Sequence, residues 1–181
     1  MAGDIAPIAA VFADHGAPAP EFVWDPAVGQ ASAEALCFLT SYWRGIAAEG
    51  QLPHLRKIDP TELRPALGYV MLLDAVDEGR DFRYRLYGSI IASISGFDMT
   101  GKLLSEHPSS PYTIEFSIAT NRAVLRRRRP IYTVRSPVGA EQTMSWQRVV
   151  LPLVDDSGTV VRLLSGTAPI ARDGRVIRAA F

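Results

Sequence analysis

The chain has 181 residues, 48% of them hydrophobic, which suits one globular domain with a packed core. Nineteen basic and nineteen acidic residues give a formal net charge of zero, so no overall charge attracts nucleic acid or an anionic membrane. A single cysteine, Cys37, excludes an internal disulfide and favours a reducing compartment. No stretch reaches the roughly 18 uninterrupted apolar residues of a membrane-spanning helix, and Asp4 and Pro7 do not fit a signal peptide. We therefore expect a cytoplasmic protein with neither a nucleic-acid partner nor a membrane partner.

The first 30 residues are rich in Ala, Pro and Gly, so we interpret residues 1–30 as an N-terminal arm. The first clear helix is expected over residues 32–50, where Ser32 can cap its start and Gly50 can end it. Its apolar residues fall on one stripe: Leu36, Leu39, Trp43 and Ile46.

Strand patterns follow this helix. The segments "YVMLLDAV" and "DFRYRLY" flank a Gly-containing turn, "DEGR", and predict a hairpin. A helical turn over residues 89–95 and a long helix from Pro111 to the residues before Pro130 are expected next. Three further strands end the pattern: "PIYTVRSP", "TMSWQRVVLPLV" and "VVRLLSGTAPIA". This order predicts an α+β fold, a five-stranded antiparallel sheet with helices on one face and the N-terminal helix flanking the sheet.

Several short motifs accompany this order of elements. They are Tyr42-Trp43, Ile58-Asp59-Pro60, the strand end Tyr84-Arg85-Leu86-Tyr87-Gly88, and the glycine motifs Gly96-Phe97, Asp98-Met99-Thr100-Gly101 and Gly101-Lys102. Together they resemble the PAS domain, a small sensory module, and a bacterial subfamily of stand-alone single-PAS proteins. The resemblance implies one domain over residues 31–171 with a short tail over 172–181. It also implies a sensory or regulatory protein in signal transduction, without an output domain of its own, that acts through a small organic ligand, through protein contacts or through both.

No cofactor, metal site or catalytic residue is expected. The haem-binding PAS variants carry an axial histidine on the long helix, whereas His107 precedes that helix here. The light-sensing flavin variants need a reactive cysteine near the short helices, whereas Cys37 lies in the leading helix. Two alternatives stay open, namely a constitutive interaction scaffold with a filled core and a small α+β cone-type enzyme. Such an enzyme would need an Asp, Glu or His in its cavity, and His107 is the main candidate.

Strand alternation suggests which side chains face a cavity between the sheet and the connecting helices. In residues 143–154 we place Ser145 and Gln147 on the helix-covered face together with Val149, Leu151 and Leu153. The candidate cavity residues are Tyr84, Leu86, Ile90, Ile94, Phe97, Tyr112, Ser145 and Gln147. Gln147 and Ser145 are the expected polar anchors of a ligand, unless backbone groups or each other are their partners.

The opposite face of the same strand carries Met144, Trp146, Arg148 and Val150 and is too apolar to be left in water. Either the leading helix, through Trp43, or a second subunit is expected to cover it. We therefore assign Trp43, Met144, Trp146 and Val150 to packing against the leading helix or across a dimer interface. We also predict a homodimer and a separate signalling protein as partner. The four arginines Arg126 to Arg129 are interpreted as a helix end favoured by the helix dipole, with an anionic partner as the alternative.

Overall fold

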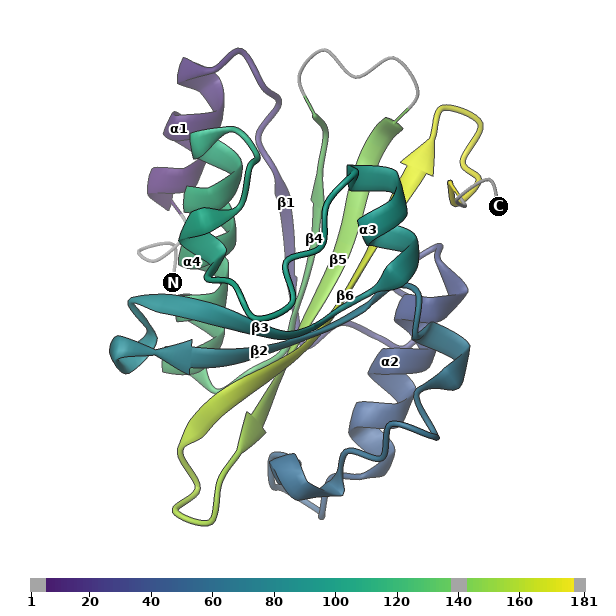
Figure 1. The fold of residues 1–181 in the computed structure, drawn as a ribbon, viewed down its shortest axis with the longest axis vertical. Helices are drawn as coiled ribbons and strands as arrows, with labels where there is room; N and C mark the ends of the chain where they lie inside the picture. The colour runs from purple at the N-terminus through teal and green to yellow at the C-terminus, as the bar shows by residue number, and fades with distance from the viewer. Residues whose placement is uncertain (1–5, 138–142, 178–181) are drawn as a thin grey trace.

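The computed structural model of the chain describes residues 6–137 and 143–177 and has the expected α+β architecture (Figure 1). All neighbouring strand pairs are antiparallel, in the order β1-β4-β5-β6-β2-β3. The strands are β1 (Glu21–Trp24), β2 (Val70–Val76), β3 (Asp81–Tyr87), β4 (Ile131–Arg135), β5 (Thr143–Val154) and β6 (Val160–Ala171). The fold class is confirmed, with a sixth strand beyond the five that were expected.

The described residues form four α-helices: α1 (Ala6–Asp14), α2 (Glu34–Gly45), α3 (Ser89–Ser95) and α4 (Pro111–Arg127). Short 3-10 helices lie between them at Leu55–Lys57, Arg64–Ala66, Asp77–Gly79 and Leu104–Glu106. Figure 1 shows α2 on one side of the strongly twisted sheet, and α1, α3 and α4 on the other. Within the described residues, no helix combines the length and the apolar character needed to cross a membrane.

The sixth strand comes from the segment interpreted as an arm. Strand β1 pairs with β4 at the edge of the sheet, with Phe22 opposite Thr133. Helix α1 packs beside α4, where the ring of Phe12 is fully buried and meets Tyr112 and Phe116 edge to face, at centroid distances of 5.1 and 5.4 Å. These contacts make residues 6–24 part of the folded unit, whereas the division of the chain into domains at residues 30 and 171 stays a prediction.

Helix α2 buries its apolar stripe against β5 and β6. Its close approach depends on Gly166, because a Cβ at that position would lie 2.4 Å from Leu39 and 2.7 Å from Leu36. The indole Nε1–H of Trp43 donates to the Pro152 carbonyl oxygen at 2.8 Å, which fixes the far end of the helix. Ser32 does not cap the start of α2 as expected. Ala33 is the N-cap residue, and the Ser32 hydroxyl accepts a hydrogen bond from the Gln147 side chain.

The face assignment of β5 was wrong. Val149, Leu151 and Leu153 belong to the core under α2, and Trp146 and Val150 belong to the core on the α3–α4 side. Gln147 therefore also lies on the α2 side, where its Oε1 accepts from the Ser32 backbone N–H at 3.0 Å. Helices cover both faces of this central strand, so both faces are apolar, and alternation alone could not distinguish them.

A bulge changes the phase of β3. Leu73 pairs with Tyr84 but Leu72 pairs with Leu86, so Arg85 is an extra residue on β3. Tyr84 consequently faces the α3–α4 side together with Tyr87, and Leu86 packs on the α2 side. The expectation that Tyr84 and Leu86 share one face was therefore wrong.

The residues assigned to dimer packing are covered within the chain. Trp43 is 7% exposed in the core beneath α2, and Val150 is fully buried on the other face. Trp146 is half-buried on the α3–α4 side, not beneath the leading helix. The Met144 side chain lies outside the described part of the structure. Trp43 and Val150 therefore pack within the chain, and the homodimer stays a prediction.

Candidate functional site

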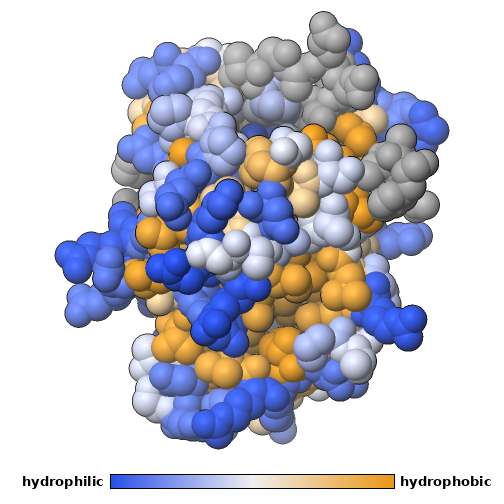
Figure 2. All heavy atoms as spheres, in the orientation of Figure 1, coloured by the Kyte–Doolittle hydropathy of each residue, from blue (hydrophilic) through white to orange (hydrophobic). Residues whose placement is uncertain are grey.

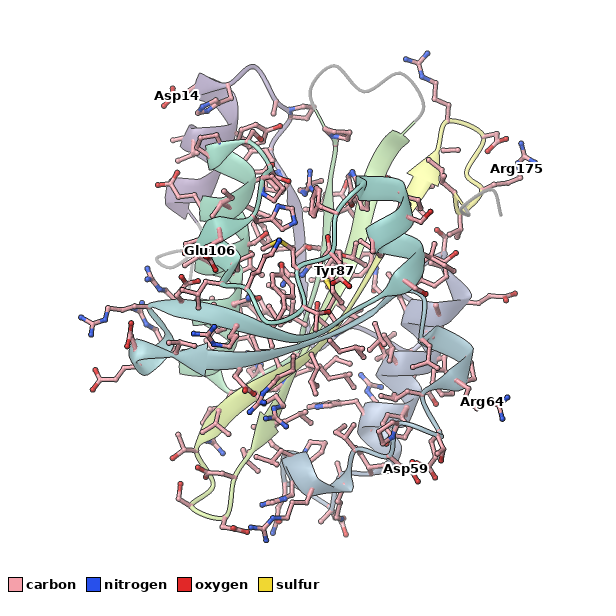
Figure 3. The ribbon with its side chains drawn as sticks, viewed as in Figure 1. Asp14, Asp59, Arg64, Tyr87, Glu106 and Arg175 are labelled. Atoms are coloured by element: carbon pink, nitrogen blue, oxygen red, sulfur yellow. The ribbon has the colours of Figure 1, made fainter. Side chains whose placement is uncertain are left out.

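A cavity of about 100 Å³ lies between the sheet and the segment that runs from α3 to α4. Tyr87, one of its lining residues, lies near the centre of the molecule beside α3 (Figure 3). A cavity needs a volume of roughly 10–15 Å³ to hold one water molecule, so this cavity has room for a small organic molecule. Its apolar lining residues are Met71, Ile91, Leu104, Ile114, Phe116 and Trp146. Its polar lining residues are Tyr84, Tyr87, Ser95, His107, Ser109, Thr113, Ser117, Thr133, Arg135, Arg148 and Thr167.

A pair of glycines positions α3 at the edge of this cavity. Gly88 ends the strand motif that begins at Tyr84, and a Cβ on it would lie only 2.5 Å from the Gly68 carbonyl oxygen. The same carbonyl accepts hydrogen bonds from the backbone N–H groups of Ile90 and Ile91, at 3.0 and 3.2 Å. The chain therefore turns directly from β3 into α3, and this turn brings Ile91 into the cavity wall.

Arg148 is the most deeply buried charged group of the site. It is 8% exposed, and its Nε donates to the Ser165 hydroxyl at 3.1 Å. One terminal nitrogen, Nη2, donates to Asn121 Oδ1 at 2.8 Å, whereas the other, Nη1, is buried without a partner among the described residues. Asn121 is itself fully buried on α4, and its Nδ2 also lacks a partner there. Burial lowers the pKa of Arg148, yet a guanidinium remains charged at neutral pH.

A second arginine lines the same space. The Arg135 guanidinium lies over the Trp146 ring, 5.7 Å from its centroid. Burial lowers the pKa of Arg135 to about 10, and the neighbouring charge of Arg148 acts in the same direction. No Asp or Glu is among the described lining residues, so the two arginines give the cavity a positive electrostatic potential.

His107 also forms part of the cavity wall. Its Nδ1 accepts from the Ser109 backbone N–H at 3.3 Å, and its Nε2 lies 3.5 Å from the Tyr87 hydroxyl. Burial, followed by the charges of Arg135 and Arg148, lowers the pKa of His107 to about 4. The ring is therefore neutral at pH 7, and the bond from Ser109 leaves the proton on Nε2.

Three aromatic side chains surround the His107 ring. The Phe97 ring meets the His107 ring edge to face at 4.9 Å, and the Tyr84 and Tyr87 rings meet each other in the same manner at 5.2 Å. Burial raises the pKa of both tyrosines, so their hydroxyl groups remain protonated. These groups can donate or accept hydrogen bonds but carry no charge.

Of the eight candidate cavity residues, only Tyr84 lines the cavity. Phe97 lies just behind its wall, against His107 and Tyr87. The other six lie elsewhere. The bulge places Leu86 on the α2 side, and Ser145 and Gln147 belong to the other face of β5. Ile90 and Ile94 of α3 are not among the lining residues, and Tyr112 packs on Phe12. Ile90 lines a separate open groove beside the start of α2.

The two arginines were not among the candidates. Arg148 sits in a strand of otherwise apolar residues, "SWQRVVLPL", on the face that seemed to need a cover. A charged residue inside such a strand is rarely buried unless it has a partner. This rule could have identified Arg148 as a candidate site residue, but only once it is known that its face of β5 is buried.

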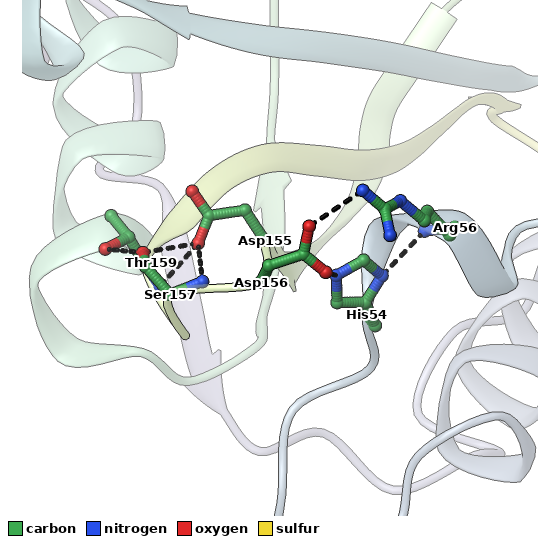
Figure 4. Close-up of polar contacts among 6 residues, drawn as sticks. All are labelled: His54, Arg56, Asp155, Asp156, Ser157 and Thr159. Carbon is green, nitrogen blue, oxygen red and sulfur yellow. Dashed lines mark hydrogen bonds and ion pairs between the residues drawn. The ribbon is translucent and has the colours of Figure 1, made fainter.

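Other polar clusters of the described residues have structural roles. A serine, a histidine and an aspartate occur near the β5–β6 turn, but Figure 4 shows His54 facing Asp156, whereas Ser157 lies with Asp155 and Thr159. The Ser157 hydroxyl donates to Asp155 Oδ1 at 2.6 Å and does not contact His54. His54 Nδ1 accepts from the Arg56 backbone N–H, and its Nε2 faces Asp156 at 3.1 Å. Because the Ser157 hydroxyl is bonded to Asp155 and not to His54, these side chains do not form a triad, and the cluster stabilises the β5–β6 turn.

Three of the four consecutive arginines at the end of α4 contact different neighbours. Arg127 lies over the Trp24 ring, Arg128 donates to the Gly158 carbonyl oxygen and Arg129 pairs with Asp25. This divergence supports the interpretation as a helix end, because the side chains do not converge on one partner. No group of three or more potential metal-ligating residues occurs in the described ranges.

A family model described as a PAS domain matches residues 31–167, which span most of the chain. No curated protein and no solved structure matches the chain. The matched range begins just before α2 and ends within β6, so it includes every element that lines the cavity.

Proposed function

Because the chain belongs to the PAS domain family, we propose that it is a sensory or regulatory module that responds to a small organic molecule held in the cavity. The observation that carries this proposal is the space of about 100 Å³ at the centre of the domain, lined by both apolar and polar side chains. Small-molecule sites typically combine apolar walls with a few polar groups in this manner. A constitutive scaffold with a filled core would not need this space, so the cavity favours the sensor over the scaffold.

The enzyme alternative would depend on His107, the histidine of the cavity. A general base works best when its pKa lies near the working pH. The pKa of His107 is about 4, so the ring binds a proton weakly at neutral pH. No Asp or Glu joins it among the described lining residues. These features favour a binding role for the cavity, and they support a protein without catalytic activity of its own.

A cavity-filling variant tests the proposal. Ser117 lines the cavity from α4, so Ser117→Leu would fill part of the space with a larger apolar side chain. Glu115→Leu places the same side chain on the exposed face of the same helix and serves as the matched control. Native mass spectrometry of the wild-type and control proteins should detect a retained or added small molecule that the Ser117→Leu protein does not bind. Equal binding by all three proteins, with circular dichroism showing intact folds, would contradict a ligand site in this cavity.

We propose further that the signal passes to another protein and that the chain forms a homodimer, as PAS domains commonly do. Figure 2 shows apolar residues gathered in the lower half of the view, between the β2–β3 hairpin and α2. Leu72 and Leu86 are only half-buried at this junction, which makes it a more suitable interface than the buried Trp43 and Val150. Sedimentation velocity at high micromolar concentration should detect a dimer, and a monomer would contradict this assembly. The cytoplasmic location inferred from the sequence stays a prediction.

A further inference from the structure

We propose that the cavity ligand is a small organic carboxylate, bound through Arg148 and Arg135. This inference rests on the proposed ligand-sensing function and adds the chemical class of the ligand. It follows from a charge and a set of hydrogen-bond donors that the described part of the protein leaves unmatched.

The charge of Arg148 has no counter-ion among the described residues. Buried charges in folded proteins are normally paired or fully hydrogen-bonded, because removing them from water is unfavourable. The hydrogen-bond partners of Arg148 are Ser165 and Asn121, which are neutral. An ionised Tyr84 could balance the charge of Arg148, but burial raises the pKa of Tyr84 and its hydroxyl stays protonated. Arg135 contributes a second positive charge to the same cavity, where the described lining residues include no acidic group. A bound anion would neutralise both.

The unused hydrogen-bonding capacity also points to an acceptor. Arg148 Nη1 is buried without a partner in the described structure, and guanidinium nitrogens only donate. Its orientation is fixed from two sides, since Nε donates to Ser165 and Nη2 donates to Asn121. Asn121 is therefore a positioning residue that holds the guanidinium against the cavity. A ligand oxygen beside Nη1 would complete the set of bonds.

The rest of the lining favours an organic anion over an inorganic one. Part of the wall is apolar and cannot donate hydrogen bonds to the oxygens of phosphate or sulfate; it consists of Met71, Ile91, Leu104 and Phe116. A carboxylate provides two acceptor oxygens for arginine on one side and a short carbon chain on the other. The volume of about 100 Å³ limits this chain to a few carbon atoms. Hydroxyl groups such as that of Thr133 can bind a further polar substituent.

Paired probes of nearly equal shape test the charge requirement. Calorimetric titration in Tris chloride would compare straight-chain carboxylates of two to five carbons, including propionate and succinate, with their amides and with inorganic phosphate. We expect at least one carboxylate to bind and its amide to bind at least tenfold more weakly. Arg148→Met should weaken carboxylate binding roughly 30-fold or more, as expected when a buried charge pair loses one partner. Arg64→Met removes an equal charge from an exposed position on the periphery and should leave binding unchanged (Figure 3).

Two further variants keep the test decisive if Arg148→Met does not fold. Arg135→Met removes the second charge, and Arg148→Lys keeps the first charge but loses the planar donor pair, so both should weaken carboxylate binding while circular dichroism remains that of the wild type. If a neutral molecule is retained in the cavity, or if amide and carboxylate bind equally, the carboxylate assignment is wrong and the ligand-sensing function stands. If no probe binds and Ser117→Leu changes no bound mass, both are wrong. Tight binding of phosphate alone would also overturn the carboxylate assignment.

Discussion

Gly88 offers the most direct test of how the strand motif builds the site. Its φ of −57° and ψ of 132° are accessible to any residue, so Gly88→Ala introduces no backbone strain of its own. The cost arises from contact, because the new Cβ would lie 2.5 Å from the Gly68 carbonyl oxygen, 2.7 Å from its carbon and 3.0 Å from the Tyr69 nitrogen. All three are backbone atoms, which cannot rotate away as a flexible side chain would.

The magnitude follows from what must move. Relief of the clash requires α3 to separate from Gly68, which lengthens the hydrogen bonds from the Ile90 and Ile91 N–H groups. Each bond contributes a net of about 0.5–1.5 kcal/mol, and overpacking in a dense region costs about 1–3 kcal/mol. We therefore expect the free energy of unfolding to fall by about 2–6 kcal/mol. For a chain of this length, a loss of 3 kcal/mol lowers the melting temperature by roughly 6–12 °C.

Urea denaturation followed by circular dichroism measures this loss. Gly45→Ala is the matched control, because a Cβ at the end of α2 meets no atom within 4 Å, and alanine favours helix. The control should be as stable as the wild type or slightly more stable. A Gly88→Ala protein with the wild-type free energy of unfolding would refute the account of this motif as a backbone contact.

Two further perturbations test the histidine wall and the N-terminal segment. His107 takes up a proton near pH 6.5 in the unfolded chain but only near pH 4 in the folded protein. The free energy of unfolding should therefore fall as the pH is lowered from about 6.5 to about 4. After allowance for solvent screening of this partly exposed ring, the loss should be about 1–2 kcal/mol, and thermal melts of His107→Asn should show a shallower decline. An equally steep decline in the variant would assign the effect to other groups. Phe12→Ala should destabilise the protein by about 3–5 kcal/mol in urea, because it removes a fully buried ring between α1 and α4, whereas Val28→Ala, at an exposed position, should have little effect. An unchanged midpoint for Phe12→Ala would show that α1 contributes nothing to the fold.

The order of elements could be predicted from the sequence because each has a local signature. Pro111 begins α4, Pro130 follows it, and the "DEGR" turn joins β2 to β3, as expected. Strand β1 could not be recognised, since it is only four residues long and lies among Ala, Pro and Gly. Its partner β4 is more than 100 residues away, and no local pattern encodes such a pairing.

The candidate site was harder to predict, for two physical reasons. Strand alternation separates the two faces of β5 but does not state which one meets the α3–α4 side, because Val149 and Val150 are both fully buried in apolar cores. The extra residue Arg85 then reverses the phase of β3 after Tyr84, and nothing in "RYRLYG" marks it as a bulge. As a result, two sets of residues expected at the cavity lie on the α2 side: Leu86 of β3, and Ser145 and Gln147 of β5. Motif resemblance could not correct these assignments, since the motifs locate turns and strand ends but not side-chain directions.

Counting charges over the whole chain could not reveal the two cavity arginines, for a related reason. A net charge of zero describes the whole chain, whereas a binding site depends on how charges are distributed locally. Arg162 and Arg85 share Asp74 as their acidic partner, which shows that the sheet can supply a carboxylate where one is required. Arg148 lies on the neighbouring strand of that sheet and has only Asn121 and Ser165. Since a carboxylate at position 121 would have neutralised it directly, the amide there is consistent with a counter-ion that the protein must obtain from outside.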